Sequence, residues 1–322
     1  MYKQNKFIMN TQTQFTNLIE LQKQFRDEDT CWKYLEKLRW TETKGNPICP
    51  FCSSNKFYEL KRKFNYRCAN SDCRKTYNVK TGSIFENTKI PLRTWFIAIY
   101  VETSHKKGIS SLQLHRDLGI TQKTAWFILH RVREMLKSKA PHMLNSTVEI
   151  DETYVGGKER FKHTRQRKDL KEGRGCVNKT MVFSILDRNS GVYSQVVNNV
   201  DGETLKPIIR TAVDKSTVIV TDGFGAYQGL NKDYRHEVVN HAQDEWVCGQ
   251  FHTNSVEGFF GLLKRGIIGI YHYVSPKHLH RYCNEFGFRY NTRTQAEAER
   301  FDNALSQCDK RLKYTDLIKK TV

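Results

Sequence analysis

Four cysteines in the N-terminal third of the chain restrict the local fold more than any other group of residues in this sequence. They form two pairs, Cys49 with Cys52 and Cys68 with Cys73, which have two and four residues inside them and fifteen between them. Four thiolates at such spacing can close a tetrahedral Zn²⁺ site, and the C-x2-C pair is the more specific half of the pattern. Because four thiolates leave no open coordination position, we expect one structural zinc ion in a zinc ribbon over residues 44–90. The alternative is a chance cluster of buried free cysteines.

The charge balance of the 322-residue chain favours a polyanionic partner. Lys and Arg number 53 against 34 Asp and Glu, which gives a net charge of +19. Phosphate contacts relieve such self-repulsion, so nucleic acid is the expected partner, with an anionic membrane surface or an acidic protein as rivals. No apolar run approaches the roughly 20 residues of a membrane span, and the N-terminus lacks the apolar stretch of a signal peptide. The five cysteines outside the cluster are scattered, which is typical of a reducing compartment, so we expect a cytoplasmic protein that contacts no membrane.

Apolar residues recur at helical spacing over residues 14–40 and 92–138, on either side of the predicted ribbon. In the second region, residues 109–118 and 122–136 read as two helices joined by a short turn that contains a glycine. This is the spacing of a helix-turn-helix, whose second helix enters the major groove of DNA. The alternative is a helical hairpin that only packs a domain. On the DNA-binding interpretation, the polar side chains expected to meet DNA are Gln122, Lys123, Arg131 and Arg133.

From residue 146 the pattern changes to three strands, a helix and a fourth strand, and the chain reads helical after residue 253. Asp151 lies in the first strand, on the face opposite Val148 and Ile150. Asp222 ends the fourth strand, a position where functional sites collect in open α/β sheets. Glu257 lies on the following helix, with 34 residues between it and Asp222. Each residue alone has an ordinary explanation, but their order and spacing match the RNase H-like DDE arrangement.

Three carboxylates that converge in one cleft repel one another unless cations lie between them. Mg²⁺ or Mn²⁺ accepts carboxylates while it keeps waters and phosphate oxygens, and two ions about 4 Å apart can drive an in-line phosphoryl displacement. We therefore expect Asp151, Asp222 and Glu257 to hold two such ions. Lys264 follows Glu257 by seven residues, about two helical turns, and could hold a DNA phosphate unless it is simply exposed. The nine Lys and Arg of residues 158–179 indicate a basic loop that grips DNA, or else a solvated loop.

These residues resemble the insertion-sequence transposases of the ISXO type, which are prokaryotic DDE enzymes with an N-terminal zinc ribbon, related to the Merlin elements of eukaryotes. The resemblance implies terminal-repeat binding by the front end, strand cleavage and transfer by Asp151, Asp222 and Glu257, and multimers on paired ends. The chain departs from the family at its second knuckle, which is usually C-x2-C, and this affects the expected zinc geometry. Some relatives have Asn as the third residue, so Asn254 is the alternative to Glu257. The similarity covers about residues 15–295 and is carried by the segments 80–85, 150–157, 252–259, 262–266, 271–279 and 288–291.

The sequence thus predicts a multidomain α+β protein that acts as a DNA transposase on double-stranded DNA, at element ends and target, without a nucleotide cofactor. By the resemblance, it would act as a homo-oligomer at the nucleoid of a prokaryotic cell. Two other classes stay open: a DNA-binding regulator with an inert RNase H-like domain, and a structure-specific nuclease or resolvase without strand transfer. The expected regions are an N-terminal helical segment (1–43), a zinc ribbon (44–90), a helix-turn-helix (91–145), an RNase H-like α/β catalytic domain with a mixed central sheet (146–295) and a C-terminal helical tail (296–322).

Overall fold

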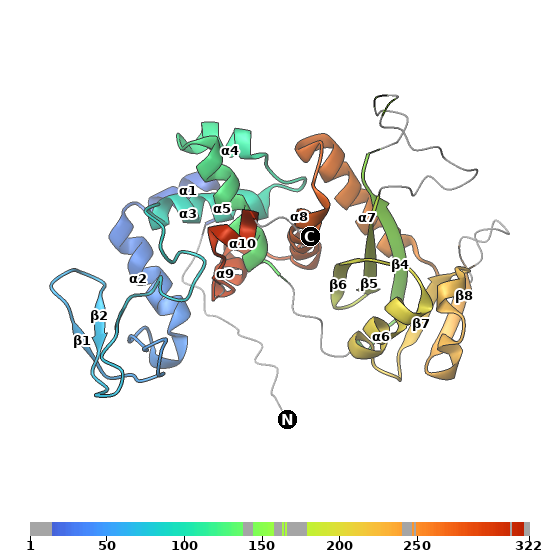
Figure 1. Cartoon of the computed structure of the whole chain (residues 1–322), viewed down its shortest axis with the longest axis horizontal. Helices are drawn as coiled ribbons and strands as arrows, with labels where there is room; N and C mark the ends of the chain where they lie inside the picture. The colour runs from blue at the N-terminus through green and yellow to red at the C-terminus, as the bar shows by residue number, and fades with distance from the viewer. Residues whose placement is uncertain are drawn as a thin grey trace. The chain divides into compact units, whose positions relative to one another are not determined.

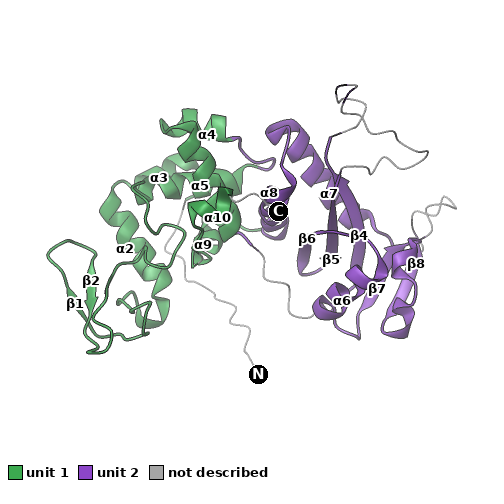
Figure 2. Ribbon diagram, viewed as in Figure 1, with its two compact units in different colours: residues 1–105, 111–135, 294–319 green, residues 106–110, 136–293, 320–322 purple. Residues whose placement is uncertain are grey.

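A computed structural model (Figure 1) describes residues 15–137, 144–157, 163, 165, 179–239, 247, 249–309 and 311–318. The chain forms two compact units, shown in Figure 2. Unit 1 contains residues 1–105, 111–135 and 294–319, and unit 2 contains residues 106–110, 136–293 and 320–322. The chain returns to unit 1 at residue 294, so residues 294–319 belong to the same unit as the cysteine cluster. No helix in the described ranges is both long and apolar enough to cross a membrane.

Unit 1 begins with two short helices and a small antiparallel sheet. Asn17 and Asp27 cap the two helices by accepting hydrogen bonds from backbone N–H groups of the first turn. The sheet has the order β1-β2-β3. Cys68 lies in β2, Cys73 lies between β2 and β3, and Cys49 and Cys52 lie in the segment before β1. The elements are α1 (Leu18–Gln24), α2 (Glu28–Arg39), η1 (Thr41–Thr43), β1 (Phe57–Glu59), β2 (Tyr66–Cys68) and β3 (Thr76–Tyr77).

The core of unit 1 joins its N-terminal, middle and C-terminal segments through aromatic side chains. The ring of Phe301 lies 5.5 Å from that of Phe15 and 5.5 Å from that of Phe96, in edge-to-face geometry. Phe25 packs against Phe96 at 4.9 Å. Such rings each bury a large apolar area, and edge-to-face pairs add to this stabilisation. The helices of this part are α3 (Leu92–Ser104), α4 (Ser111–Leu118), α5 (Gln122–Met135), α9 (Glu297–Ser306) and α10 (Tyr314–Ile318).

Unit 2 is built on a five-stranded mixed sheet of order β6-β5-β4-β7-β8. β4 pairs antiparallel with β5, and β5 with β6, whereas β7 runs parallel to β4 and β8 parallel to β7. This confirms the predicted α+β class with a mixed central sheet. The last strand, β8, was not predicted from the sequence. The strands are β4 (Val148–Val155), β5 (Thr180–Asp187), β6 (Gly191–Val197), β7 (Val218–Asp222) and β8 (Arg235–Val239).

Helices cover both faces of this sheet (Figure 1). Val148 and Ile150 of β4 belong to the apolar core that includes Leu205 of α6, whereas Val155 belongs to the core that includes Phe260 of α7. Because side chains alternate along a strand, even-numbered residues of β4 face α6 and odd-numbered residues face α7 and α8. The remaining elements are α6 (Gly202–Ala212), η4 (Gly225–Tyr227), η5 (Leu230–Lys232), α7 (Asn254–Gly266), the π-helical turn η7 (Ile267–Tyr271) and α8 (Pro276–Asn291).

Candidate active site

The pairing of β4 with β7 brings the two predicted aspartates to neighbouring positions. The two strands run parallel, with Glu149 opposite Val220. Asp151 and Asp222 each lie two residues further along their strands, so they continue the same register. Both point to the face opposite the α6 core, since Ile219 packs in that core and residues alternate along β7. The structure therefore sets these two carboxylates side by side on the α7 face of the sheet.

Glu257 approaches the same face from the first turn of α7. This helix is held on the sheet by Val256 and Phe260, which are buried, while Glu257 itself is exposed. Burial raises the pKa of Asp151 to about 8, and the negative charges of Glu152, Asp222 and Glu257 add to the effect. The three carboxylates predicted from the sequence are thus close enough to repel one another.

The carboxylate oxygens are not drawn into a tight cluster. Within the described ranges, the four cysteines form the only group of three or more metal-ligating side chains whose ligand atoms all lie within 4.8 Å of one another. The exposed Glu257 accepts a hydrogen bond from the Thr253 hydroxyl at 3.1 Å. Closing the three carboxylates around a cation would require this side chain to move, which its exposure allows. Asn254, the alternative third residue, is also exposed and lies three residues before Glu257, on the same side of α7.

A fourth carboxylate, Glu152, lies beside the three and was missed in the sequence. It points to the α6 side of β4, where its Oε2 accepts a hydrogen bond from the Tyr227 hydroxyl at 2.6 Å. Burial raises the pKa of Glu152, and the charge of Asp222 raises it further. In the sequence, its position directly after Asp151 was the one feature that could have pointed to it. Such a residue adds negative charge next to Asp151 without facing α7.

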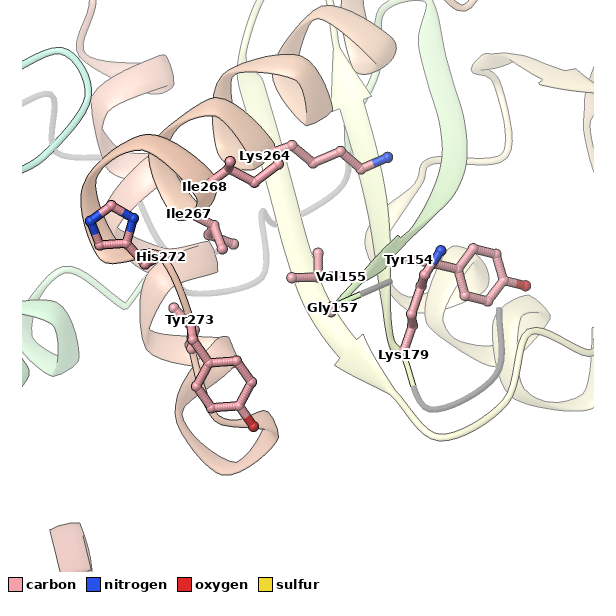
Figure 3. A pocket seen from close by; sticks show the side chains of 11 residues that line it. Tyr154, Val155, Gly157, Lys179, Lys264, Ile267, Ile268, His272 and Tyr273 are labelled. Atoms are coloured by element: carbon pink, nitrogen blue, oxygen red, sulfur yellow. The ribbon is translucent and has the colours of Figure 1, made fainter. Parts of the chain in front are cut away.

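Lys264 lines a pocket of about 480 Å³ that opens between the end of β4 and the turn after α7. Figure 3 shows the Lys264 side chain extending from α7 toward the side of the pocket where Tyr154 and Lys179 lie. Burial lowers the pKa of Lys264, while the negative charge of Asp151 acts in the opposite direction. The predicted lysine is therefore within electrostatic range of the first aspartate, and its wall of the pocket also carries His272 and Tyr273.

The four cysteine sulfurs fit the predicted tetrahedral zinc site. Sulfurs bound to one tetrahedral zinc at about 2.3 Å lie about 3.8 Å apart. Cys49 Sγ lies 3.7 Å from Cys73 Sγ, and Cys52 Sγ lies 3.5 Å from Cys68 Sγ. The two extra residues of the second knuckle are taken up in a turn around Asn70, whose carbonyl oxygen accepts hydrogen bonds from the N–H groups of Cys73 and of the next residue. The C-x4-C spacing is therefore compatible with a closed four-sulfur site.

The structure corrects part of the predicted DNA-contacting set. Gln122 and Lys123 are exposed at the N-terminal end of α5. Arg131 is buried, and its guanidinium donates to the carbonyl oxygens of Ile84 and Glu86. Arg133, two residues further along α5, is also buried. The expectation that Arg131 contacts DNA is wrong, because its side chain is buried inside unit 1.

The same correction applies to Arg133. Its guanidinium lies 3.1 Å from Glu102 Oε1, and both side chains are almost completely buried. Removing either member would leave an uncompensated buried charge, and the burial of Arg133 makes it unavailable to phosphate. The predicted basic loop of residues 158–179 lies outside the described residues, apart from 163, 165 and 179.

Comparisons with known proteins agree with this architecture. A transposase zinc-ribbon domain matches residues 26–76, and an ISXO2-like transposase domain matches residues 143–291. A protein of the transposable element ISH50 from Halobacterium salinarum is 31% identical over 279 residues, which are 83% of this chain and 92% of that protein. A transposase-like protein of Haemophilus influenzae is 30% identical over 101 residues, which are 31% of this chain and 80% of that protein.

Among solved structures, the Mos1 Strand Transfer Complex is similar at 15% identity and a TM-score of 0.28, covering 70% of this chain and 77% of that chain. This likeness is too low to support a conclusion about fold or function. The two domain matches and the haloarchaeal relative, which this chain covers almost completely, decide the family. The chain belongs to the ISXO2-like transposases, with a transposase zinc-ribbon domain before the ISXO2-like transposase domain.

Proposed function

We propose that this protein is an active DNA transposase that cuts and joins DNA with Asp151, Asp222 and Glu257 as the ligands of two divalent cations, Mg²⁺ or Mn²⁺. The observation that carries the proposal is that β4, β7 and α7 present these carboxylates on one face of the sheet, where their mutual repulsion helps raise the pKa of Asp151 to about 8. Hard divalent cations favour such all-oxygen ligand sets and would relieve the repulsion.

Each residue has a separate task in the proposed reaction. When bound, the two cations would favour attack by a hydroxyl and departure of the leaving oxygen at phosphorus. Asp151 and Asp222, on neighbouring paired strands, would hold the cations in place. The exposed Glu257 would complete the ligand set from α7. Lys264 binds the DNA phosphate at the edge of the pocket, beside Asp151. Neither a covalent protein intermediate nor a nucleotide cofactor is needed.

The DNA-binding front end is assigned to α4 and α5 together with the zinc ribbon. α4 and α5 are consecutive helices of 8 and 14 residues separated by a short turn, and the exposed Gln122 and Lys123 stand at the start of α5. In a helix-turn-helix, the N-terminal residues of the second helix reach the base edges. We propose that this unit recognises the terminal repeats of the element, that the active form is a homo-oligomer on paired ends, and that it acts at the nucleoid in the prokaryotic cytoplasm.

A strand-transfer assay tests the proposed chemistry. Pre-cleaved element ends and a supercoiled plasmid are incubated with zinc-loaded protein, with Mg²⁺ added or left out, so that no chelator removes the zinc. Wild type is compared with Glu257→Gln and with Glu203→Gln, a matched control because Glu203 is also exposed in the first turn of a helix of unit 2. We expect Mg²⁺-dependent joined product from wild type and Glu203→Gln, and none from Glu257→Gln.

The other outcomes identify the alternatives. Joining that survives Glu257→Gln would move the third ligand to Asn254. Mg²⁺-dependent nicking without joining would indicate a nuclease or resolvase. End binding with neither reaction would indicate a DNA-binding regulator with an inert catalytic domain.

A further inference from the structure

A buried glutamate, Glu149, lies on β4 two residues before Asp151. Its side chain is completely buried, although glutamate is rarely buried without partners. Glu149 Oε2 accepts hydrogen bonds from the backbone N–H groups of Ser255 at 2.8 Å and Val256 at 3.1 Å. These two N–H groups belong to the first turn of α7, the helix that carries Glu257. One carboxylate therefore connects the strand of the first proposed cation ligand to the helix of the third.

The other oxygen of Glu149 extends the connection. Glu149 Oε1 accepts a hydrogen bond from Arg188 Nε at 2.8 Å, and His252 Nδ1 lies 3.4 Å from it. Arg188 also donates to the carbonyl oxygens of Gln250 at 2.9 Å and His252 at 3.4 Å. The backbone that leads into α7 is thus held from the end of β5 as well as from β4. Both oxygens of the carboxylate are occupied, as a buried charge requires.

The start of α7 depends on the hydrogen bonds to Glu149, because the side chain of its own N-cap residue makes no capping hydrogen bond. The first N–H groups of a helix have no partner within the helix, and they carry partial positive charge that a carboxylate stabilises. Thr253, the N-cap residue, makes no capping hydrogen bond to the helix backbone, and its hydroxyl donates to Glu257 instead. Glu149 caps the helix in place of a local side chain. Loss of this cap would loosen the turn that contains Glu257.

We propose that Glu149 is a positioning residue for catalysis: its carboxylate sets the separation of Asp151 and Glu257 by anchoring the N-terminus of α7 to β4. This inference rests on the proposed function, since it assumes that these two carboxylates bind the cations. Glu149 touches neither substrate nor cation in this role. Groups that orient metal-ligating side chains typically change metal affinity or activity by about 10- to 100-fold when they are replaced.

The test compares Glu149→Gln with the same change at a buried glutamate of another helix. Glu285 on α8 is also completely buried and accepts hydrogen bonds from Tyr271, at 2.5 Å, and Arg289. Glu149→Gln keeps an oxygen acceptor but loses the charge, and Glu285→Gln makes the same chemical change elsewhere in unit 2. Both variants are expected to lower the melting temperature. Only Glu149→Gln is expected to alter the cation dependence.

Two measurements on the zinc-loaded full-length protein provide the readout. Binding of Mn²⁺ is followed without DNA by the loss of the free-ion electron paramagnetic resonance signal, with Asp222→Asn defining the site. The Mn²⁺ midpoint for strand transfer is measured in parallel. We expect Glu149→Gln to raise both midpoints about tenfold or more, and Glu285→Gln to leave both within about twofold of wild type.

The outcomes separate this inference from the proposed function. Unchanged midpoints in Glu149→Gln, or equal shifts in both variants, would overturn the positioning role, whereas a wild type that neither binds Mn²⁺ at Asp222 nor joins DNA would overturn the proposed function itself. If Glu149→Gln does not fold, Arg188→Gln replaces it, because Arg188 is partly exposed and supports the same carboxylate. It should raise both midpoints in the same direction by a smaller factor, and the absence of any shift would again reject the inference.

Discussion

Replacement of Phe301 by alanine is expected to lower the free energy of unfolding of unit 1 by about 4 kcal/mol, because Phe→Ala at fully buried sites costs about 3–5 kcal/mol. The Phe301 side chain is completely buried, and its ring lies within 5.9 Å of the rings of Phe15, Phe25 and Phe96. Three aromatic partners place the loss in the middle or upper part of that range, since each such pair contributes beyond its buried area. Phe301 lies 21 positions from the C-terminus, yet its replacement should destabilise unit 1, which also contains residues 1–105.

Urea denaturation followed by tryptophan fluorescence measures this loss. Four of the five tryptophans, Trp32, Trp40, Trp95 and Trp126, lie in unit 1 and report its unfolding. With a urea slope of about 2 kcal/mol per molar, the midpoint should fall by about 2 M. The melting temperature should fall by about 10 °C.

The matched control is Glu299→Ala, which changes an exposed residue of the same helix. Its free energy of unfolding should stay within about 0.5 kcal/mol of wild type. A loss below about 1 kcal/mol for Phe301→Ala would contradict the placement of α9 in the unit 1 core. So would a loss seen only in signals from unit 2.

Three further changes have defined outcomes. Cys73→Ser should lower the zinc content measured by mass spectrometry and abolish binding to element ends, because loss of one thiolate opens the four-sulfur site; full zinc retention would contradict the ligand set. Lys264→Gln should reduce strand joining at least tenfold while end binding, measured by gel shift, is unchanged, since a charged hydrogen bond to phosphate is worth about 1.5–3 kcal/mol; equal loss of both would contradict a local role. Burial raises the pKa of Asp187, but hydrogen bonds from Ser146 and Ser190 outweigh it and hold the pKa below its ordinary 3.8. Its stabilisation is therefore complete above about pH 4 and is lost as the pH falls through the lower folded value. Asp187→Asn should remove this part of the acid dependence in urea denaturation between about pH 5 and pH 2, and an unchanged pH slope would refute it.

The parts of the fold that follow from local chemistry could be predicted from the sequence. Alternation of Val148 and Ile150 with acidic residues indicates a strand, and β4 is a strand, although both of its faces are covered. The β8 strand was missed because Arg235 and Glu237 give it a polar pattern, which an edge strand tolerates since one side meets solvent. Its apolar residues are too few to produce the alternation from which a strand is predicted.

Long-range pairing explains the other differences. The helical pattern alone gives Arg131 and Arg133 a place on the helix surface. It does not reveal that Arg133 pairs with Glu102, or that Arg131 donates to the carbonyl of Ile84, in the interior of unit 1. The contact of Glu149 with α7 likewise joins residues more than 100 positions apart. Burial of a charged side chain depends on such distant partners, so sequence patterns alone predict these residues as exposed.

The register of β4 links the stability of the fold to the geometry of the candidate site. Glu149 and Asp151 face α7, while Glu152 faces α6 and meets Tyr227. A slip of one residue would exchange the two faces, sending Asp151 away from Asp222 and burying apolar residues against the wrong helix. Eight consecutive pairs with β5 oppose such a slip. The interactions that hold the sheet together are therefore the same ones that place the carboxylates, and no separate element is needed to align the first two.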